Sequence, residues 1–173
     1  MFQNTIFNYS IFEFPEPEEL NRKLLNDFSE LKNHNEIKRT HLFNGRYENI
    51  YVSLDKTPEL KPVLEFASQC AQQVLDLNKA LDIGYWFNDM PPQSVTIPHT
   101  HDDDDELLSG AYYIKVPENS GNLIITTNKN KKEITPKEGQ LILFKADCQH
   151  EVTKNNSQQD RLSIGMNFGL KQF

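Results

Sequence analysis

The chain has 173 residues, of which 37% are hydrophobic and 25% are charged, and its formal net charge is −7. This length favours one domain over residues 1–173, and it allows a core that needs no crosslinks. The negative charge argues against a protein that coats nucleic acid, the strand-sized apolar runs argue against a membrane span, and two cysteines cannot form a disulfide framework, so we expect a cytoplasmic protein.

The first part, residues 1–82, has a mixed pattern. Aromatic and β-branched residues over 5–14 predict an early strand. The segment Pro15 to Glu19 places proline and acidic residues where a helix N-terminus favours them, and leucines at helical spacing follow. Asn44-Gly45 indicates a turn. A second helix with an apolar face is expected after Thr57-Pro58-Glu59.

From Ile83 onward the hydrophobic period changes to two, which is typical of strands. Segments rich in proline, glycine and asparagine separate the apolar runs. The candidate strands are 84–88, 94–101, 107–116, 123–127, 132–134, 140–144, 150–153 and 161–168. Short strands at this regular spacing predict a jelly roll, or double-stranded β-helix, over residues 83–173. The expected fold class is mainly β (α+β), with the N-terminal helices packed on one sheet.

Three of the five histidines lie in this β half and can contribute to a metal site. If the strand continues through them, His99, His101 and Asp103 share one face because alternate residues of a strand do so. His150 follows at the start of a later predicted strand. Two imidazoles and a carboxylate on neighbouring strands can occupy one face of an octahedral iron and leave three positions open. The acidic residues after Asp103 are expected to be solvated loop.

A candidate carboxylate-binding pair follows His150 by 11 residues. Arg161 and Ser163 share a face of the last predicted strand. A guanidinium binds a carboxylate bidentately, and a hydroxyl can add a third hydrogen bond. An isolated arginine more often forms a surface salt bridge. Beside an iron-ligand pattern, we interpret this pair as a site for the distal carboxylate of 2-oxoglutarate.

Several pieces of the β half keep the order and spacing of a known enzyme family. They are Trp86-Phe87-Asn88, Pro98-His99-Thr100-His101, Ser109-Gly110-Ala111-Tyr112-Tyr113-Ile114, Pro136 to Phe144, His150-Glu151-Val152 and Arg161 to Ile164. Together they resemble the Fe(II)/2-oxoglutarate-dependent dioxygenases, in their prolyl-hydroxylase-like branch, over roughly half of the chain. The resemblance implies Fe(II) as cofactor and 2-oxoglutarate as cosubstrate. It also implies hydroxylation of a C–H bond of a small-molecule or peptide substrate, with release of succinate and carbon dioxide.

The resemblance implies roles for single residues as well. His150 matches the distal iron histidine of the family. Arg161 matches the arginine that holds the tail of 2-oxoglutarate, with Ser163 beside it. Tyr113 matches a tyrosine that often donates a hydrogen bond to the same cosubstrate.

The family's histidine–any–aspartate motif fits this sequence in two ways. The literal match is His101-Asp102-Asp103. Measured by distance from the preceding turn, the first histidine is His99, and His101 falls where the carboxylate belongs. We rank His101 and His150 first as iron ligands, and we rank Asp103 and His99 equally in second place.

Two other classes of protein remain alternatives. A cupin shares the fold and binds metal, and His99-any-His101 followed by Glu106 resembles the first cupin motif. The last histidine of a cupin comes a few residues after a Pro-any-Gly turn, whereas His150 lies 11 residues beyond Gly139 with a predicted strand between them. A non-catalytic jelly-roll binding module would keep the strands without the converging histidines and the arginine. The pattern therefore favours the dioxygenase.

Overall fold

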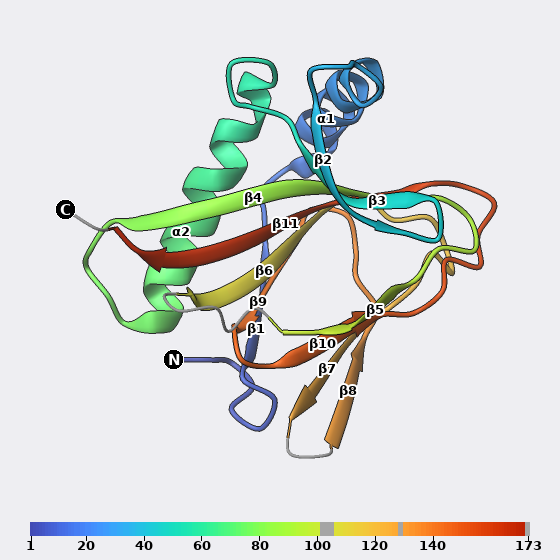
Figure 1. Cartoon of the computed structure of the whole chain (residues 1–173). Helices are drawn as coiled ribbons and strands as arrows, with labels where there is room; N and C mark the ends of the chain where they lie inside the picture. The colour runs from blue at the N-terminus through green and yellow to red at the C-terminus, as the bar shows by residue number, and fades with distance from the viewer. Residues whose placement is uncertain (101–105, 128–129, 172–173) are drawn as a thin grey trace.

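The computed structural model describes residues 1–100, 106–127 and 130–171. Strands dominate this part of the chain, and two α-helices precede most of them (Figure 1). The elements in chain order are β1 Tyr9–Glu13, α1 Pro17–Leu31, β2 Lys38–Phe43, β3 Arg46–Tyr51, the 3-10 turn η1 Pro58–Leu60, α2 Lys61–Leu75, β4 Leu81–Met90, β5 Thr96–His99, β6 Glu106–Lys115, β7 Leu123–Thr127, β8 Asn130–Ile134, β9 Gln140–Lys145, β10 Gln149–Val152 and β11 Arg161–Leu170.

The strands form two antiparallel sheets. A seven-stranded sheet has the order β1-β9-β6-β11-β4-β3-β2, and a four-stranded sheet has the order β5-β10-β7-β8. Figure 1 shows the two sheets as two layers, with both helices on the side of the larger sheet that faces away from the smaller one. This arrangement is the jelly roll expected from the sequence, and the sheets do not close into a barrel.

The larger core joins the helices to the seven-stranded sheet. Leu24 and Phe28 of α1 and the apolar face of α2 pack on the inward residues of that sheet. Phe28 stacks on Phe87 of β4, with ring centroids 4.9 Å apart. Full burial of such a side chain stabilises the fold by about 1.5–3 kcal/mol. The amphipathic helices therefore find the sheet partner that their sequence pattern requires.

A smaller core lies between the two sheets. Its members, from β6, β7, β8, β9 and the turn before β10, are Tyr113, Leu123, Ile125, Ile134, Ile142, Phe144 and Cys148. Side chains alternate along β11, so that Leu162 and Ile164 join the helix-side core while Arg161 and Ser163 belong to the other face. Polar residues thus replace the apolar filling between the sheets at this end of β11.

The eight strands expected after residue 83 and both expected helices are confirmed, with boundaries shifted by a few residues. The strand expected over 5–14 is present as the shorter β1. The hairpin formed by β2 and β3 was missed, apart from its Asn44-Gly45 turn. None of the described helices is long and apolar enough to cross a membrane.

Candidate functional site

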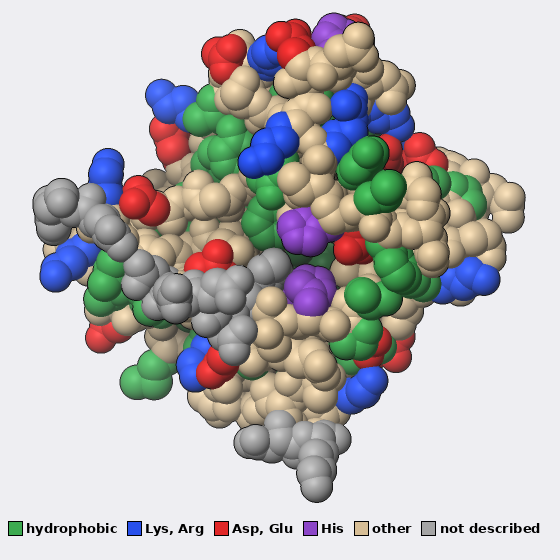
Figure 2. Space-filling view, viewed as in Figure 1, with side chains coloured by type: hydrophobic (Ala, Val, Ile, Leu, Met, Phe, Trp, Pro, Cys, Tyr) green, Lys and Arg blue, Asp and Glu red, His purple; other side chains and the backbone are tan. Residues whose placement is uncertain are grey.

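A cavity of about 470 Å³ opens between the two sheets. Figure 2 shows it as a hollow near the middle of one face, with histidine side chains on either side. Its walls come from β5 and β10 of the small sheet, from β4, β6 and β11 of the large sheet, and from the β2–β3 hairpin. All described residues that the sequence marked for iron or cosubstrate line this cavity, namely His99, Tyr113, His150, Arg161 and Ser163.

Strand pairing brings two of these histidines together. His99 ends β5, and its Cα is the direct partner of the His150 Cα on β10. Their ring centroids are 4.2 Å apart, with the ring planes at 55°. The His150 ring also packs on Phe144, at 4.7 Å between centroids, and the residue is only 7% exposed. Two imidazoles held this closely at the edge of a cavity can share one metal ion.

Backbone carbonyls fix the orientation of both imidazoles. Nδ1 of His99 lies 2.8 Å from the carbonyl oxygen of Ile97, and Nδ1 of His150 lies 3.1 Å from that of Cys148. A carbonyl only accepts, so each Nδ1 carries the proton and donates it. This tautomer leaves Nε2 as the nitrogen whose lone pair a metal can take. The arrangement is the usual one for a histidine prepared to bind a metal.

The other two candidate ligands, His101 and Asp103, lie outside the described residues. Within the described ranges, no group of three or more His, Cys, Asp and Glu residues could hold a metal ion. The described chain therefore contributes two of the expected iron ligands. The sequence ranked His99 and Asp103 equally as candidate ligands, and the strand register places His99 against His150.

Arg161 and Tyr113 form a buried polar pair in the same cavity. Arg161 is 2% exposed, and its guanidinium carbon lies 5.2 Å from the centre of the Tyr113 ring. One guanidinium nitrogen donates to the carbonyl oxygen of Gly121 at 2.9 Å. The Nε of Arg161 and the hydroxyl of Tyr113 have no hydrogen-bond partner among the described residues, although both are buried. Buried donors without a partner are costly, so they indicate a missing acceptor.

Electrostatics define the kind of acceptor that this pair needs. Burial raises the pKa of Tyr113, against a smaller opposing effect of the Arg161 charge, so the phenol remains a donor. Burial lowers the pKa of Arg161, but an arginine guanidinium stays protonated in proteins. A buried cation without an anion is unfavourable. Ser163, whose Cα is the partner of the Tyr113 Cα, lines the cavity beside them. Together these groups can hold a carboxylate.

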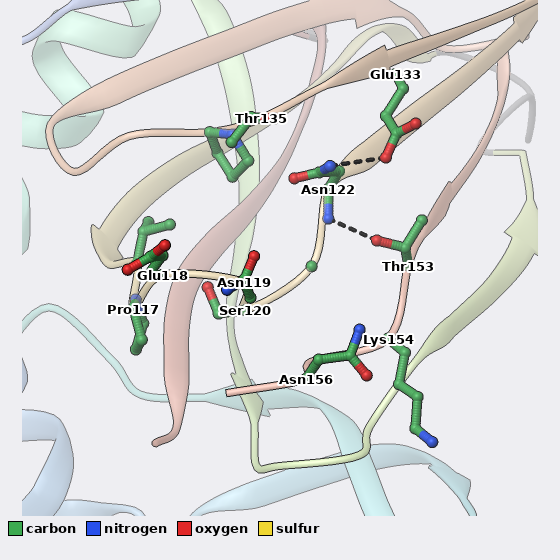
Figure 3. Close-up of a pocket in the computed structure, with 13 residues that line it drawn as sticks. Pro117, Glu118, Asn119, Ser120, Asn122, Glu133, Thr135, Thr153, Lys154 and Asn156 are labelled. Atoms are coloured by element: carbon green, nitrogen blue, oxygen red, sulfur yellow. Dashed lines mark hydrogen bonds between the residues drawn. The ribbon is translucent and has the colours of Figure 1, made fainter. Parts of the chain in front are cut away.

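A second, more polar hollow of about 400 Å³ lies on the other side of Gly121. Figure 3 shows it, with Asn122 hydrogen-bonded to Glu133 and Thr153. Gly121 has a φ of +100°, and a Cβ there would collide with the carbonyl oxygen of Thr153. Glycine therefore lets this loop lie against the backbone of Thr153, and the Gly121 carbonyl oxygen accepts the hydrogen bond from Arg161. The described lining of this hollow includes no histidine, so the candidate metal chemistry belongs to the cavity between the sheets.

Small residues make room for an aromatic wall in the main cavity. Trp86 on β4 pairs with Gly165 on β11. A Cβ at Gly165 would lie 2.5–2.6 Å from atoms of the Trp86 indole, so the ring lies flat over this backbone. Trp86 is the only tryptophan of the chain. It therefore also provides an intrinsic fluorescence signal at the cavity wall.

Sequence reasoning missed one wall of the cavity, which the β2–β3 hairpin contributes. The side chains concerned are His41, Glu48, Asn49 and Tyr51. His41 is exposed and also borders the cavity, with a φ of +56° in the middle of its strand. An Asn-Gly turn between segments of β propensity is the signal that would have predicted this hairpin.

A protein-family comparison decides the identity of the chain. The model of the 2OG-Fe(II) oxygenase superfamily matches residues 86–169, the segment that carries the paired histidines and Arg161. Residues 86–169 belong to the 2OG-Fe(II) oxygenase superfamily. The chain is therefore an Fe(II)- and 2-oxoglutarate-dependent dioxygenase, with Fe(II) as cofactor and 2-oxoglutarate as cosubstrate. This membership replaces the cupin and the non-catalytic binding module as explanations of the jelly roll.

Solved structures agree with this family in fold. A Pseudomonas putida prolyl-4-hydroxylase superposes with a TM-score of 0.70 at 18% identity, covering 94% of this chain and 92% of that one. The non-heme α-ketoglutarate-dependent carbocyclase SnoK from nogalamycin biosynthesis gives 0.75 at 13% identity, covering 94% and 79%. A Trichoplax adhaerens prolyl hydroxylase, in complex with a peptide of hypoxia inducible factor, gives 0.67 at 15% identity, covering 94% and 83%. A comparison with curated protein sequences finds no match.

The residues of the cavity fit both groups that the family uses. Two imidazoles with Nδ1 bound to carbonyl oxygens suit Fe(II). The buried donors of Arg161 and Tyr113 suit the distal carboxylate of 2-oxoglutarate. Cofactor and cosubstrate therefore each have a matching set of donors within one cavity.

Proposed function

We propose that this oxygenase hydroxylates a C–H bond of a small-molecule or peptide substrate. His101 and His150 bind the iron, and His99, whose Cα is the direct partner of the His150 Cα, completes the set in preference to Asp103. Arg161, Tyr113 and Ser163 bind the distal carboxylate of 2-oxoglutarate.

One observation carries this proposal. The Nε of Arg161 and the hydroxyl of Tyr113 are buried, and no described residue bonds to them, in the cavity that the His99–His150 pair also lines. A structural arginine would have its donors satisfied by carbonyls or carboxylates of the chain. Within the part of the chain that the structure describes, the Gly121 carbonyl is the one acceptor that Arg161 uses. A dianion with one carboxylate at Arg161 and Tyr113 would satisfy these donors, and its other end would reach the metal that the histidines would hold.

Fe(II), when bound, lets oxygen oxidise 2-oxoglutarate to succinate and carbon dioxide, and the second oxygen atom becomes the hydroxyl group of the substrate. The residues of the chain position the reactants. The fixed tautomers of His99 and His150 present Nε2 to the metal without reorganisation. Arg161 orients the cosubstrate from the far end of the cavity. Tyr113, whose ring lies under the Arg161 guanidinium, donates a hydrogen bond from its hydroxyl to the same carboxylate. The apolar Phe144 shields the His150 side from water.

The substrate class follows from the size of the site. A cavity of about 470 Å³ that holds 2-oxoglutarate leaves space for a small molecule or for one side chain of a peptide. The peptide complex of the Trichoplax adhaerens prolyl hydroxylase is a precedent for the second case in the same fold. The β2–β3 hairpin lies where either substrate would contact the chain.

The test is formation of succinate by anaerobically purified protein that is reloaded with Fe(II) and then given 2-oxoglutarate and air. Wild-type protein should form succinate in an iron-dependent manner and bind about one Fe(II) per chain. His150→Ala should lose both properties, because it removes a ligand.

Glu30→Gln, a change on the exposed side of α1, provides the control and should retain both properties. Full iron affinity in His150→Ala would contradict the ligand assignment. A wild-type protein that binds iron but neither binds 2-oxoglutarate nor forms succinate would contradict the proposed reaction.

A further inference from the structure

We infer that Glu48, on the β2–β3 hairpin, binds a positively charged nitrogen of the primary substrate, so that the enzyme acts on an amine or a guanidine. This inference rests on the proposed function, because it concerns the side of the same cavity that iron and cosubstrate leave open.

The position of Glu48 in the chain supports a role in substrate binding. The family match spans residues 86–169 and includes the paired histidines, Tyr113, Arg161 and Ser163. Only the hairpin contributes described cavity residues from outside that segment, and they are His41, Glu48, Asn49 and Tyr51. Residues that serve the common chemistry lie inside the matched segment. We therefore expect the hairpin residues, rather than the residues of the matched segment, to determine which primary substrate this chain binds.

The charges of the wall favour a cation. The described lining of the cavity contains two residues of the types Asp, Glu, Lys and Arg, and they are Glu48 and Arg161. Arg161 serves the cosubstrate, which leaves Glu48 for the primary substrate. Figure 2 shows acidic side chains beside the hollow on two sides. The net charge of −7 also attracts cations toward the protein.

Arg46 holds the Glu48 carboxylate in a fixed orientation. A guanidinium nitrogen of Arg46 donates to Oε1 of Glu48 at 2.7 Å, and both side chains are at most 14% exposed. Arg46 in turn donates to the Asn88 side chain at 2.9 Å and to the Val95 carbonyl at 3.0 Å. No hydrogen bond from a described residue reaches Oε2 of Glu48. The carboxylate is therefore an oriented acceptor with one oxygen still available.

Aromatic residues of the same cavity suit a cation as well. Trp86 and Tyr51 both line it, and aromatic faces attract ammonium and guanidinium groups. Two cations lie near this wall. Arg46 pairs with Oε1 of Glu48 at 2.7 Å, and the ammonium of Lys38 lies 5.2 Å from the centre of the Tyr51 ring. Neither of them lines the cavity, and Lys38 is exposed, so water and salt screen it. The largely buried carboxylate of Glu48 is the negative charge that the described lining presents to a substrate.

The experiment compares charged probes with neutral molecules of nearly the same shape. The N-acetyl amides of L-arginine and L-lysine are added to the iron-loaded enzyme with 2-oxoglutarate. The N-acetyl amides of L-citrulline and L-norleucine are the neutral counterparts, because blocking the α-amine leaves the side chain as the only difference in charge. Succinate formation and Trp86 fluorescence report on substrate binding. At least one cationic probe should raise succinate formation about tenfold or more over its neutral counterpart, since one favourable charge-assisted bond corresponds to about that factor.

Glu48→Gln removes the negative charge of Glu48 but keeps the hydrogen bond, because the amide oxygen can still accept from Arg46. The concentration of cationic probe that gives half-maximal stimulation should rise about tenfold or more in this variant. The 2-oxoglutarate affinity should stay within about twofold, which shows that the cavity is intact. Glu30→Gln, an exposed change on α1, is the matched control and should behave as the wild type.

Three results would overturn the inference while leaving the proposed function in place. They are equal stimulation by charged and neutral probes, no response to any cationic probe by an enzyme that binds 2-oxoglutarate, and unchanged stimulation in Glu48→Gln. A wild-type protein that fails to bind 2-oxoglutarate would instead overturn the proposed function, and this inference with it.

Discussion

His99 on β5 lies directly opposite His150 on β10, with 4.2 Å between their ring centroids. This pairing bears on the two ways in which the iron motif fits the sequence. A strand register is a discrete arrangement, and a shift by one residue would turn the side chain to the other face. The observed register therefore supports the alignment in which His99 is the first histidine of the motif.

The first prediction separates His99 from Asp103. His99→Ala should weaken Fe(II) binding by at least about 10–100-fold, because even residues behind a ligand have effects of that size. Asp103→Ala should have a clearly smaller effect if His101 supplies the third ligand. Iron titrations under nitrogen measure both variants. Equal losses in the two variants would contradict the view that one of them is a bystander.

The second prediction concerns the Tyr113 hydroxyl. Tyr113→Phe removes one uncharged donor from the proposed carboxylate site, so 2-oxoglutarate affinity should fall about 3–10-fold, as for a net loss of about 0.5–1.5 kcal/mol. Burial raises the pKa of Tyr113, and the phenol loses its proton only above that raised value. Wild-type affinity for 2-oxoglutarate should therefore persist as pH rises to about 10, the ordinary pKa of a free tyrosine. A decline in affinity centred below that pH would show that Tyr113 is not shielded.

The third prediction uses the contact between Gly165 and Trp86. Gly165→Ala places a methyl group 2.5–2.6 Å from the indole, so the ring must move. We expect a shifted Trp86 emission spectrum and a loss of about 1–3 kcal/mol in the free energy of unfolding. Gly84→Ala, on the neighbouring strand with open space around it, is the control and should change the emission little. Identical spectra for both variants and the wild type would contradict the flat packing of Trp86 on β11.

The fourth prediction concerns the buried ion pair of Arg46 and Glu48. Arg46→Met leaves a largely buried carboxylate without its partner, and the free energy of unfolding should fall by about 3 kcal/mol. The exposed pair of Arg22 and Glu19 has the same 2.7 Å separation. Arg22→Met should therefore lower the free energy of unfolding far less, because solvent screens this exposed pair. Urea denaturation measures both, and similar losses would mean that burial does not govern these pairs.

The sequence was sufficient for the jelly roll because its signal is local. Period-two alternation from Ile83 onward and the turn residues between the runs predict each strand without knowledge of its partner. The hairpin of β2 and β3 has the Asn44-Gly45 turn but lacks a clear period-two alternation on either side of it. Its residues are mostly polar and partly exposed on both faces, and the edge strand β2 contacts only β3 within its sheet. The polar wall of the cavity was missed for the same reason.

The site was predictable in part. The residue types and the spacing of His150, Arg161 and Ser163 indicated the chemistry. The choice between His99 and Asp103 depends on which residue of one strand faces a partner about fifty positions away, and sequence spacing does not contain that register. The sequence also did not predict how Glu48 is held, because Arg46 on β3 donates to Asn88 on β4 and to Val95 just before β5, and only the folded chain brings these residues together.

The most direct test of this account is a calorimetric titration of the Mn(II)-substituted protein with 2-oxoglutarate. The wild type should bind about one molecule per chain. Arg161→Ala removes a bidentate, charge-assisted pair of about 1.5–3 kcal/mol per bond, so affinity should fall by one to a few orders of magnitude, while metal affinity hardly changes. Arg161→Lys should recover only part of the loss, since an ammonium lacks the planar fork. No binding to the wild type, or unchanged binding to Arg161→Ala, would contradict the account.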